Sequence, residues 1–200
     1  MKVTSMTLGP LETNCYVVTD EQTGGCVVID PASRGKHIAQ TLQEDGLHLL
    51  AILLTHAHFD HIGGLKTLQA ETNAPIYISL ADSTDPAQMS DGFLTFTDLV
   101  KDGDVLTFDG LQFTVLETPG HTPGSVCYLC GNELFSGDTL FAGSCGRTDF
   151  KGGDAGQMMQ SLKKLSGLSG QLRVLPGHGE SSTIADEQMS NPYMKEAMRR

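Results

Sequence analysis

The chain has 200 residues, of which 13 are lysine or arginine and 24 are aspartate or glutamate, so its formal net charge is −11. This acidic balance excludes general nucleic-acid binding, which depends on basic side chains that neutralise phosphates. Hydrophobic residues make up 39% of the sequence, enough for the core of one compact domain over residues 1–200, and no stretch approaches the ~20 apolar residues of a membrane-spanning helix.

Strand and helix patterns alternate through the first half of the chain. Two apolar runs on either side of the polar segment 20–25 predict a hairpin, and the apolar run before Thr55 is long enough for one buried strand. In chain order, the expected elements are strands 14–19 and 26–30, a helix 34–45 that Gly46 ends, a strand 49–54, a helix 62–72 and a strand 75–78.

The second half of the chain contains two further predicted hairpins and one amphipathic helix. Asp109-Gly110 and Gly131-Asn132 are typical turn pairs between apolar strands. The helix carries methionines and leucines on one face, where methionine is interpreted as core filler. The expected elements are a hairpin over 105–116, a hairpin over 127–135 and a helix over 155–165. Strand pairs that alternate with helices predict an α/β fold.

Three histidines and one aspartate lie close together directly after the strand predicted over 49–54. They are His56, His58, Asp60 and His61. They fall on a strand-to-helix turn, where open sheets place their ligand sites. Without a metal, such histidines would repel one another when protonated and would need other partners when neutral. Because imidazole and carboxylate are good ligands for zinc, iron and manganese, the turn predicts a metal site with more than one metal.

Three later segments each present one more candidate ligand. In each, an apolar strand ends, a glycine permits a tight turn, and a metal-competent side chain stands in that turn: His121, Asp138 and His178. The remaining two histidines, His37 and His48, lie outside this pattern and are interpreted as structural. Four strand-end segments in series therefore supply one metal centre.

This succession of ligands resembles the metallo-β-lactamase superfamily of metal-dependent hydrolases, and the surrounding residues are similar to its glyoxalase II branch, the hydroxyacylglutathione hydrolases. The resemblance runs from about Leu8 to Tyr193. It is carried by the motifs Thr55–His61, Thr118–Ser125, Ser136–Phe141, Gly146–Phe150 and Pro176–Gly179. It implies an αββα sandwich of two mixed sheets with flanking helices.

The resemblance also implies a dinuclear centre of two divalent cations, zinc being expected and iron or manganese being acceptable to the same ligands. The implied ligands are His56, His58 and His121 for the first metal, Asp60, His61 and His178 for the second, and Asp138 as the bridge. Spacing supports part of this assignment independently, because His56 and His58 alternate along an extended stretch and can project the same way.

The implied activity is hydrolysis of a small-molecule thioester such as S-lactoylglutathione, by hydroxide generated at the metals and without a covalent acyl-enzyme. Asp60 is the candidate catalytic residue, which accepts a proton or orients the nucleophile. Arg147 is the candidate substrate-binding residue, since a guanidinium suits a carboxylate of the thiol portion. The alternative interpretation of Arg147 is an ion pair with Asp149 or Asp154.

Other functions use similar ligands. The segment Gly146–Phe150 also resembles the persulfide dioxygenases, which use a single iron, whereas Pro176–Gly179 is closer to the hydrolases. A lactonase, a β-lactamase or a processing nuclease would use similar ligands, although the β-lactamases usually lack a histidine at the position of His61 and the acidic charge disfavours a nuclease. A non-enzymatic metal-binding scaffold is disfavoured, because flavin-linked diiron members typically carry glutamate where His58 stands.

The five cysteines predict no second metal or redox site. Cys127 and Cys130 form a C-x-x-C pattern, but in a strand these two residues point to opposite faces. An odd cysteine count with no secretory segment predicts reduced thiols and a cytoplasmic protein. Cys145 lies in a glycine-rich loop near the inferred site. Because the chain ends at Arg200, we expect no separate C-terminal substrate-binding domain and a more open site; the oligomeric state stays open.

Overall fold

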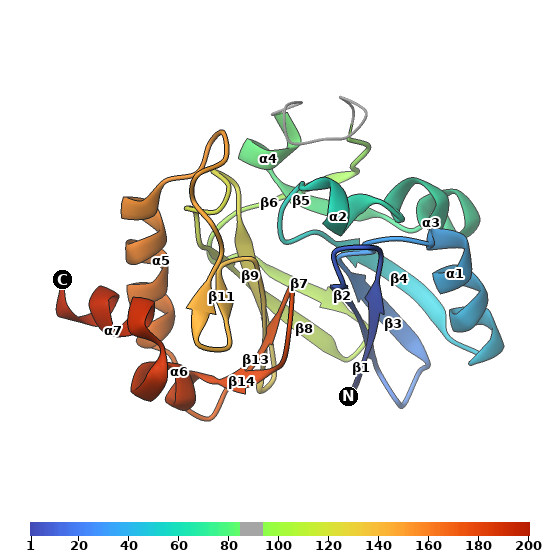
Figure 1. Cartoon of the computed structure of the whole chain (residues 1–200). Helices are drawn as coiled ribbons and strands as arrows, with labels where there is room; N and C mark the ends of the chain where they lie inside the picture. The colour runs from blue at the N-terminus through green and yellow to red at the C-terminus, as the bar shows by residue number, and fades with distance from the viewer. Residues whose placement is uncertain (85–93) are drawn as a thin grey trace.

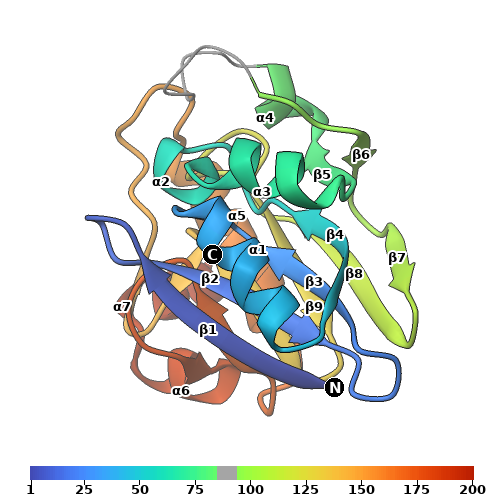
Figure 2. The ribbon, with the colours of Figure 1, turned by 90° about the vertical axis from the view of Figure 1, so that its right-hand side faces the viewer.

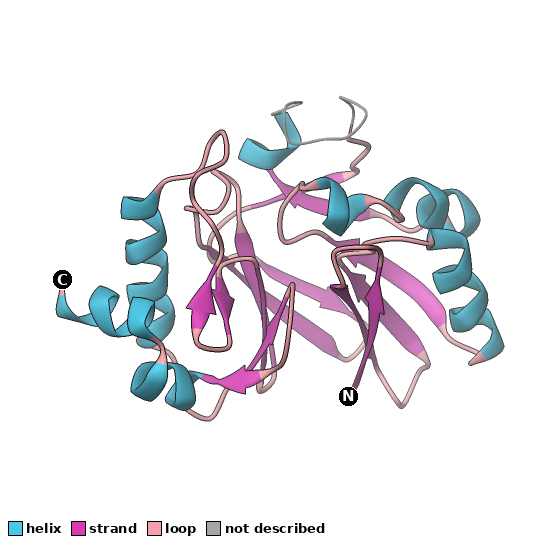
Figure 3. Cartoon of the chain, in the orientation of Figure 1, coloured by secondary structure: helices cyan, strands magenta, loops and turns pink. Residues whose placement is uncertain are grey.

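The computed structural model describes residues 1–84 and 94–200. Two six-stranded sheets pack face to face, and helices cover their outer faces (Figure 1). The predicted αββα sandwich is therefore confirmed, and Figure 3 shows its four layers by secondary structure. Among the described residues, no helix has the length and apolar character needed to cross a bilayer.

The N-terminal sheet is mixed: its first two strand pairs are antiparallel and the next three are parallel. Its strands, in spatial order, are β1 (Lys2–Leu8), β2 (Thr13–Thr19), β3 (Gly25–Ile29), β4 (His48–Leu53), β5 (Ile76–Ser79) and β6 (Asp98–Val100). The helices that follow its strands are α1 (Gly35–Glu44), α2 (Phe59–Ile62), α3 (Leu65–Thr72) and α4 (Leu80–Thr84). Figure 2 shows α1 and α3 across the outer face of this sheet.

The C-terminal sheet is antiparallel except for the parallel pair β10 and β13. Its strands, in spatial order, are β14 (Ser182–Thr183), β13 (Arg173–Pro176), β10 (Glu133–Gly137), β9 (Val126–Cys130), β8 (Leu111–Glu117) and β7 (Val105–Phe108). A small separate hairpin consists of β11 (Leu140–Phe141) and β12 (Ser144–Cys145). The helices on this side are α5 (Ala155–Ser166), α6 (Ile184–Ser190) and α7 (Pro192–Arg199).

Side-chain alternation along the strands separates the core into three layers. In β3, Val27 and Ile29 face the space between the sheets, whereas Cys26 and Val28 face α1 and α3. Because both faces are buried, the strand is a continuous apolar run. The same alternation places Cys127 under α5 and Cys130 between the sheets, so the predicted opposite orientation of these two cysteines is confirmed.

The prediction of one continuous helix over 62–72 is wrong, because the structure has two helices here. The structure begins a short helix earlier, at Phe59, and a second helix only at Leu65. The break falls at Gly63 and Gly64, which pack against the loop after β3. A Cβ at Gly64 would lie 2.6 Å from the carbonyl oxygen of Pro31, and the Gly64 N–H donates to that same oxygen. This close approach takes the backbone out of a continuous helix.

Candidate metal centre

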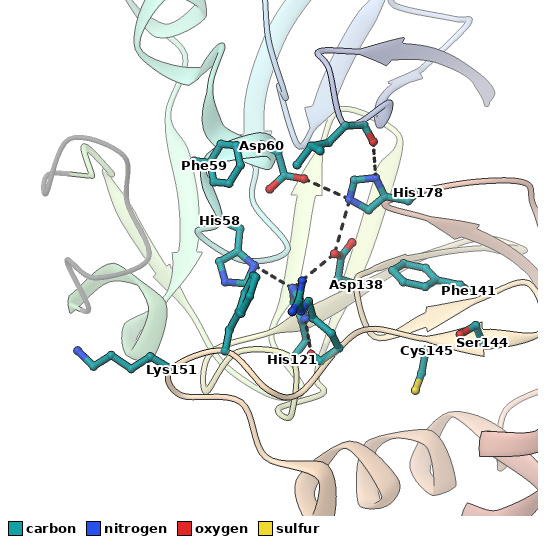
Figure 4. Close-up of a pocket in the computed structure, with 13 residues that line it drawn as sticks. His58, Phe59, Asp60, His121, Asp138, Phe141, Ser144, Cys145, Lys151 and His178 are labelled. Atoms are coloured by element: carbon teal, nitrogen blue, oxygen red, sulfur yellow. Dashed lines mark hydrogen bonds and ion pairs between the residues drawn. The ribbon is translucent and has the colours of Figure 1, made fainter.

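The seven predicted ligands meet at the edge where strands of both sheets end. Four come from the turn after β4 and the start of α2, and the other three follow β8, β10 and β13 one by one. Figure 4 shows the labelled members of the set around a common space. The full set is His56, His58, Asp60, His61, His121, Asp138 and His178, of which Figure 4 labels all but His56 and His61.

Three histidines form the first cluster, which we call the first ligand set: His56, His58 and His121. Their candidate ligand atoms all lie within 4.8 Å of one another. His58 Nδ1 is 2.8 Å from His121 Nε2. His56 and His121 are buried, being 1% and 3% exposed, and His58 is half-buried. The set therefore has the spacing of ligands to one ion.

The second ligand set consists of Asp60, His61 and His178, again within 4.8 Å of one another. His178 Nε2 lies 3.2 Å from Asp60 Oδ2, and His61 Nε2 lies 3.7 Å from the same oxygen. The His61 side chain is 0% exposed and that of His178 is 26% exposed. The second ligand set is thus accessible to solvent at His178.

Asp138 lies between the two sets. Its Oδ1 is 3.3 Å from His61 Nε2, and its Oδ2 is 3.4 Å from His121 Nε2 and 3.6 Å from His178 Nε2. One carboxylate thereby faces nitrogen atoms of both sets, in the position that a bridging ligand needs.

Unpaired buried atoms show, independently of any sequence motif, that the site residues fit divalent metal ions. Three buried atoms of the site have no hydrogen-bond partner within the described part of the chain: His56 Nε2, His61 Nε2 and Asp138 Oδ1. Buried polar atoms are costly when unpaired, and one cation in each ligand set would satisfy all three. Space is also kept open, because a Cβ on Gly177 would lie 2.2 Å from Asp138 Oδ1 and 2.6 Å from His61 Cε1.

Hydrogen bonds at the outer ring nitrogens hold the histidines in place. His121 Nδ1 is 2.8 Å from the carbonyl oxygen of Arg147, and His178 Nδ1 is 3.0 Å from that of Leu11. An N–H at each Nδ1 that donates to the carbonyl leaves Nε2 as the metal ligand. The backbone on both sides of the cavity therefore selects the tautomer of these histidines.

Asp30 is a functional residue that the sequence interpretation missed. It directly follows β3 and is buried; its Oδ2 accepts hydrogen bonds from His61 Nδ1 at 2.9 Å and from the Thr55 hydroxyl at 2.7 Å. Because that hydroxyl donates to Asp30, it accepts from His56 Nδ1 at 3.0 Å. Asp30 thus orients one histidine of each set. The signal was present, since Asp30 follows an apolar strand as Asp138 does.

The two ligand sets differ in their electrostatics. Burial and the neighbouring histidines lower the pKa of His56 well below its ordinary value and that of His58 to about 4. In the second set, burial lowers the pKa of His61, but the carboxylates of Asp138 and Asp30 outweigh it and hold that pKa well above the ordinary value. The hydrogen bond with Asp60 raises the pKa of His178. His56 and His58 of the first set are thus held as neutral imidazoles.

A cavity of about 690 Å³ opens over the ligands. Its non-ligand lining is mostly apolar and comes from several separate segments of the chain: Leu11, Phe59, Phe141, Ser144, Cys145, Arg147, Phe150 and Lys151 (Figure 4). Burial raises the pKa of the Cys145 thiol to about 11, so this cysteine is a neutral wall of the cavity. The cavity has room for a small organic substrate beside the metals.

Arg147 lines the cavity and also forms an ion pair with Asp149, which was its alternative interpretation. Its Nε and Nη2 donate to the two oxygens of Asp149, both at 2.7 Å, and its guanidinium lies 3.7 Å from the centre of the Phe150 ring. Asp154 does not pair with it and instead caps the N-terminus of α5. Asp149 and Phe150 therefore hold the guanidinium in a defined orientation.

Comparison with curated proteins finds relatives of nearly the same length. A family model described as "Metallo-beta-lactamase superfamily" matches residues 8–178. The chain is 36% identical to "Probable metallo-hydrolase YqgX" of Bacillus subtilis, over 97% of this chain and 98% of that protein. It is 32% identical to "Hydroxyacylglutathione hydrolase GloC" of Haemophilus influenzae, again over 97% and 98%.

Solved structures share the architecture. The BLEG-1 B3 metallo-beta-lactamase superposes with a TM-score of 0.89 at 36% identity, covering 96% of this chain and 99% of that one. ETHE1 from Myxococcus xanthus gives a TM-score of 0.86 at 33% identity, covering 96% and 84%. TTHA1623 in a di-iron-bound form gives 0.82 at 38% identity, covering 95% and 99%.

Proposed function

The chain belongs to the metallo-β-lactamase superfamily of metal-dependent hydrolases, and from this premise we propose that it is a dinuclear hydrolase of hydroxyacyl thioesters such as S-lactoylglutathione. The observation that carries the proposal is the presence of two complete ligand sets joined by Asp138. A single-metal enzyme would need only one of them. The relative named as a hydroxyacylglutathione hydrolase, which the chain matches over nearly its whole length, supports the thioester substrate.

In this proposal, the first set and the second set would each hold one divalent cation, with zinc as the expected metal, and Asp138 would serve both. Two such cations would supply a water whose pKa is lowered to about 7 and positive charge for the oxyanion that develops on an attacked carbonyl. His56 and His58 present neutral nitrogens, as metal ligation requires. The protein contributes the geometry of the donors and the surrounding apolar cavity.

Asp60 is the residue that we assign to proton transfer. Its Oδ2 accepts a hydrogen bond from the Thr13 hydroxyl at 3.1 Å and faces His178 Nε2. Burial raises its pKa, but the hydrogen bond with His178 and the charge on His61 outweigh burial, and the carboxyl group stays ionised. An ionised Asp60 would orient the attacking water, accept its proton at Oδ1 as the C–O bond forms, and return that proton to the thiolate released when the C–S bond breaks, a route without a covalent acyl-enzyme.

The cavity would receive the rest of the thioester. Two of the three guanidinium nitrogens of Arg147 are bonded to Asp149, and the third, Nη1, makes no hydrogen bond with any residue that the structure describes. We assign Nη1 to a carboxylate of the thiol portion. The five cysteines are free thiols, which supports a reducing compartment such as the cytoplasm for this small-molecule reaction.

A second candidate is a persulfide dioxygenase with one iron. It is favoured by the structural likeness to ETHE1 and by the segment Gly146–Phe150. Hydrolysis of a lactone or a β-lactam is a third candidate, supported by the likeness to BLEG-1. Each predicts a different metal count or substrate, so one experiment separates them.

The test is hydrolysis of S-lactoylglutathione by protein of measured metal content, followed as loss of thioester absorbance. An efficiency above about 10⁴ M⁻¹s⁻¹ with two metals per chain supports the proposal, since this lies within the ordinary enzyme range. Two bound metals without turnover reject glutathione thioesters, and lactones and β-lactams are then assayed. One bound iron with oxygen uptake on a persulfide establishes the dioxygenase.

A further inference from the structure

Asp82 is a buried carboxylate that belongs to neither ligand set. It lies on α4, directly after β5, and is 0% exposed. Its Oδ2 accepts hydrogen bonds from the Ala57 N–H at 3.0 Å and the Thr122 hydroxyl at 2.9 Å, and its Oδ1 accepts one from the Gly124 N–H at 2.7 Å. A carboxylate is costly to bury unless it is multiply hydrogen-bonded, so these contacts account for its position.

The partners of Asp82 are neighbours of the first ligand set. Ala57 stands between His56 and His58, and Thr122 directly follows His121. The first of these segments follows β4 in the N-terminal sheet, and the second follows β8 in the C-terminal sheet. A single side chain therefore joins the two backbone segments that must meet if three histidines are to bind one ion.

The surroundings leave Asp82 little freedom to move. The Ser79 hydroxyl, at the end of β5, donates to the carbonyl oxygen of Gly124 at 2.6 Å. A Cβ on Gly124 would lie 2.2 Å from that hydroxyl and 2.5 Å from Asp82 Oδ1, so only glycine permits this approach. The hydroxyls of Thr122 and Ser125 lie 2.7 Å apart. The turn after His121 is thus packed directly onto the carboxylate.

We propose that Asp82 is the positioning residue of the first metal site, where it fixes the segment His56–His58 relative to His121 across the two sheets. This inference rests on the ligand assignment of the proposed function, but not on its substrate. Asp30 differs from Asp82 in this respect, because its hydrogen bonds with Thr55 and His61 stay within the N-terminal half of the chain. Loss of a supporting residue of this kind weakens metal binding by about 10–100-fold.

The experiment measures zinc affinity rather than turnover. Metal-free wild type, Asp82→Asn and Thr122→Val are titrated with Zn²⁺ against a chromophoric chelator, which resolves two dissociation constants. His121→Ala and His178→Ala serve as references that assign each constant to one ligand set. The visible absorption of bound Co²⁺ reports the geometry of each site independently.

We expect Asp82→Asn to raise the dissociation constant of the first site about 10–100-fold and that of the second site less than about threefold. The Co²⁺ absorption of the first site should change with it. Thr122→Val, which removes one of the three bonds, should cause a smaller change of the same kind. If Asp82→Asn does not fold, Thr122→Val carries the test.

Glu187→Gln is the matched control. Glu187 is also a buried carboxylate, whose Oε2 accepts from the Gly143 N–H at 2.9 Å and from Asn191 Nδ2 at 2.7 Å. It should destabilise the fold without changing either zinc constant. The proposal is overturned if Asp82→Asn lowers stability as Glu187→Gln does but leaves zinc affinity intact, or weakens both sites equally. Absence of thioester turnover with the expected zinc constants would reject the proposed function alone.

Discussion

The two halves of the molecule supply the candidate metal ligands in different ways. In the N-terminal half, four candidates stand on the turn after β4 and the start of α2, where the extended backbone at His58 leads directly into the helix. In the C-terminal half, three strands each end in one ligand: His121, Asp138 and His178. The first arrangement is determined by local backbone geometry, whereas the second depends on how the two sheets pack.

Hydrogen bonds between the two halves hold the turns that carry His121 and His178 in place. At the first site, Asp82 reaches the turn after β8. At the second site, Asn14 in β2 donates from Nδ2 to the carbonyl oxygens of Pro176 and Gly179, both at 3.0 Å, and the Tyr16 hydroxyl donates to the former at 2.7 Å. Each C-terminal histidine is therefore held by a polar side chain from the N-terminal half.

The largest effect is expected at Asp138, where the two halves meet between the metals. Asp138→Asn keeps the shape of the side chain but removes the charge that faces His61 and His121. Weaker metal binding removes several kcal/mol of transition-state stabilisation, so kcat/KM should fall roughly a thousandfold and metal content should drop below two per chain. Elemental analysis and thioester kinetics check this. Glu196→Gln, in an exposed ion pair with Arg200, should change neither.

A smaller effect is expected when the loop after β13 loses its hydrogen bonds with Asn14 in β2. Asn14→Ala removes the amide donor to the carbonyl oxygen of Pro176, which keeps the Tyr16 hydroxyl, and to that of the exposed Gly179, so we expect a loss of about 1 kcal/mol of unfolding free energy. Zinc affinity should fall about 10–100-fold at the second site only. Urea unfolding and chelator competition measure the two effects. Thr7→Val removes only a 3.3 Å contact to Asn14, and equal losses in the two variants would contradict this account.

His58 of the first ligand set and His178 of the second should contribute to the pH dependence of stability with opposite signs in the metal-free protein. The folded pKa of His58 is lowered to about 4, so the unfolded chain binds this proton more tightly and stability falls as the pH drops from about 6.5 towards 4, by at most about 3 kcal/mol. His178 has a raised folded pKa, so its contribution is present below about pH 6.5 and is lost as the pH rises through that raised value. Urea unfolding against pH, for wild type, His58→Gln and His178→Gln, separates the two contributions.

The smallest effect is expected inside a strand rather than at its end. Cys127 is buried under α5, away from the cavity, and burial raises the pKa of its thiol to about 11. Cys127→Ala should cost about 1 kcal/mol of unfolding free energy and leave metal content and thioester kinetics unchanged. A lost metal ion in this variant would show that ligands of the C-terminal half are not confined to strand ends.

Much of the fold followed from local patterns. Turn pairs such as Asp109-Gly110 and apolar runs such as 49–54 predicted hairpins and strands that the structure contains. Two kinds of element escaped prediction. The edge strand β1 carries mostly exposed residues, so it lacks the apolar run of a buried strand. The helix α7 was also not predicted, although its start carries a sequence signal: Asn191 caps it and Pro192 is its first residue.

By itself, the sequence determined which side chains have ligand chemistry and that each stands after an apolar strand, because strand periodicity and tight turns are encoded by neighbouring residues. Only the tertiary structure decided which side chains hold those ligands in place. Asp82 and Gly124 are 42 residues apart, and Asn14 and Pro176 are 162 residues apart. Such pairs leave no local periodicity, and they meet only because two sheets from opposite halves of the chain pack face to face.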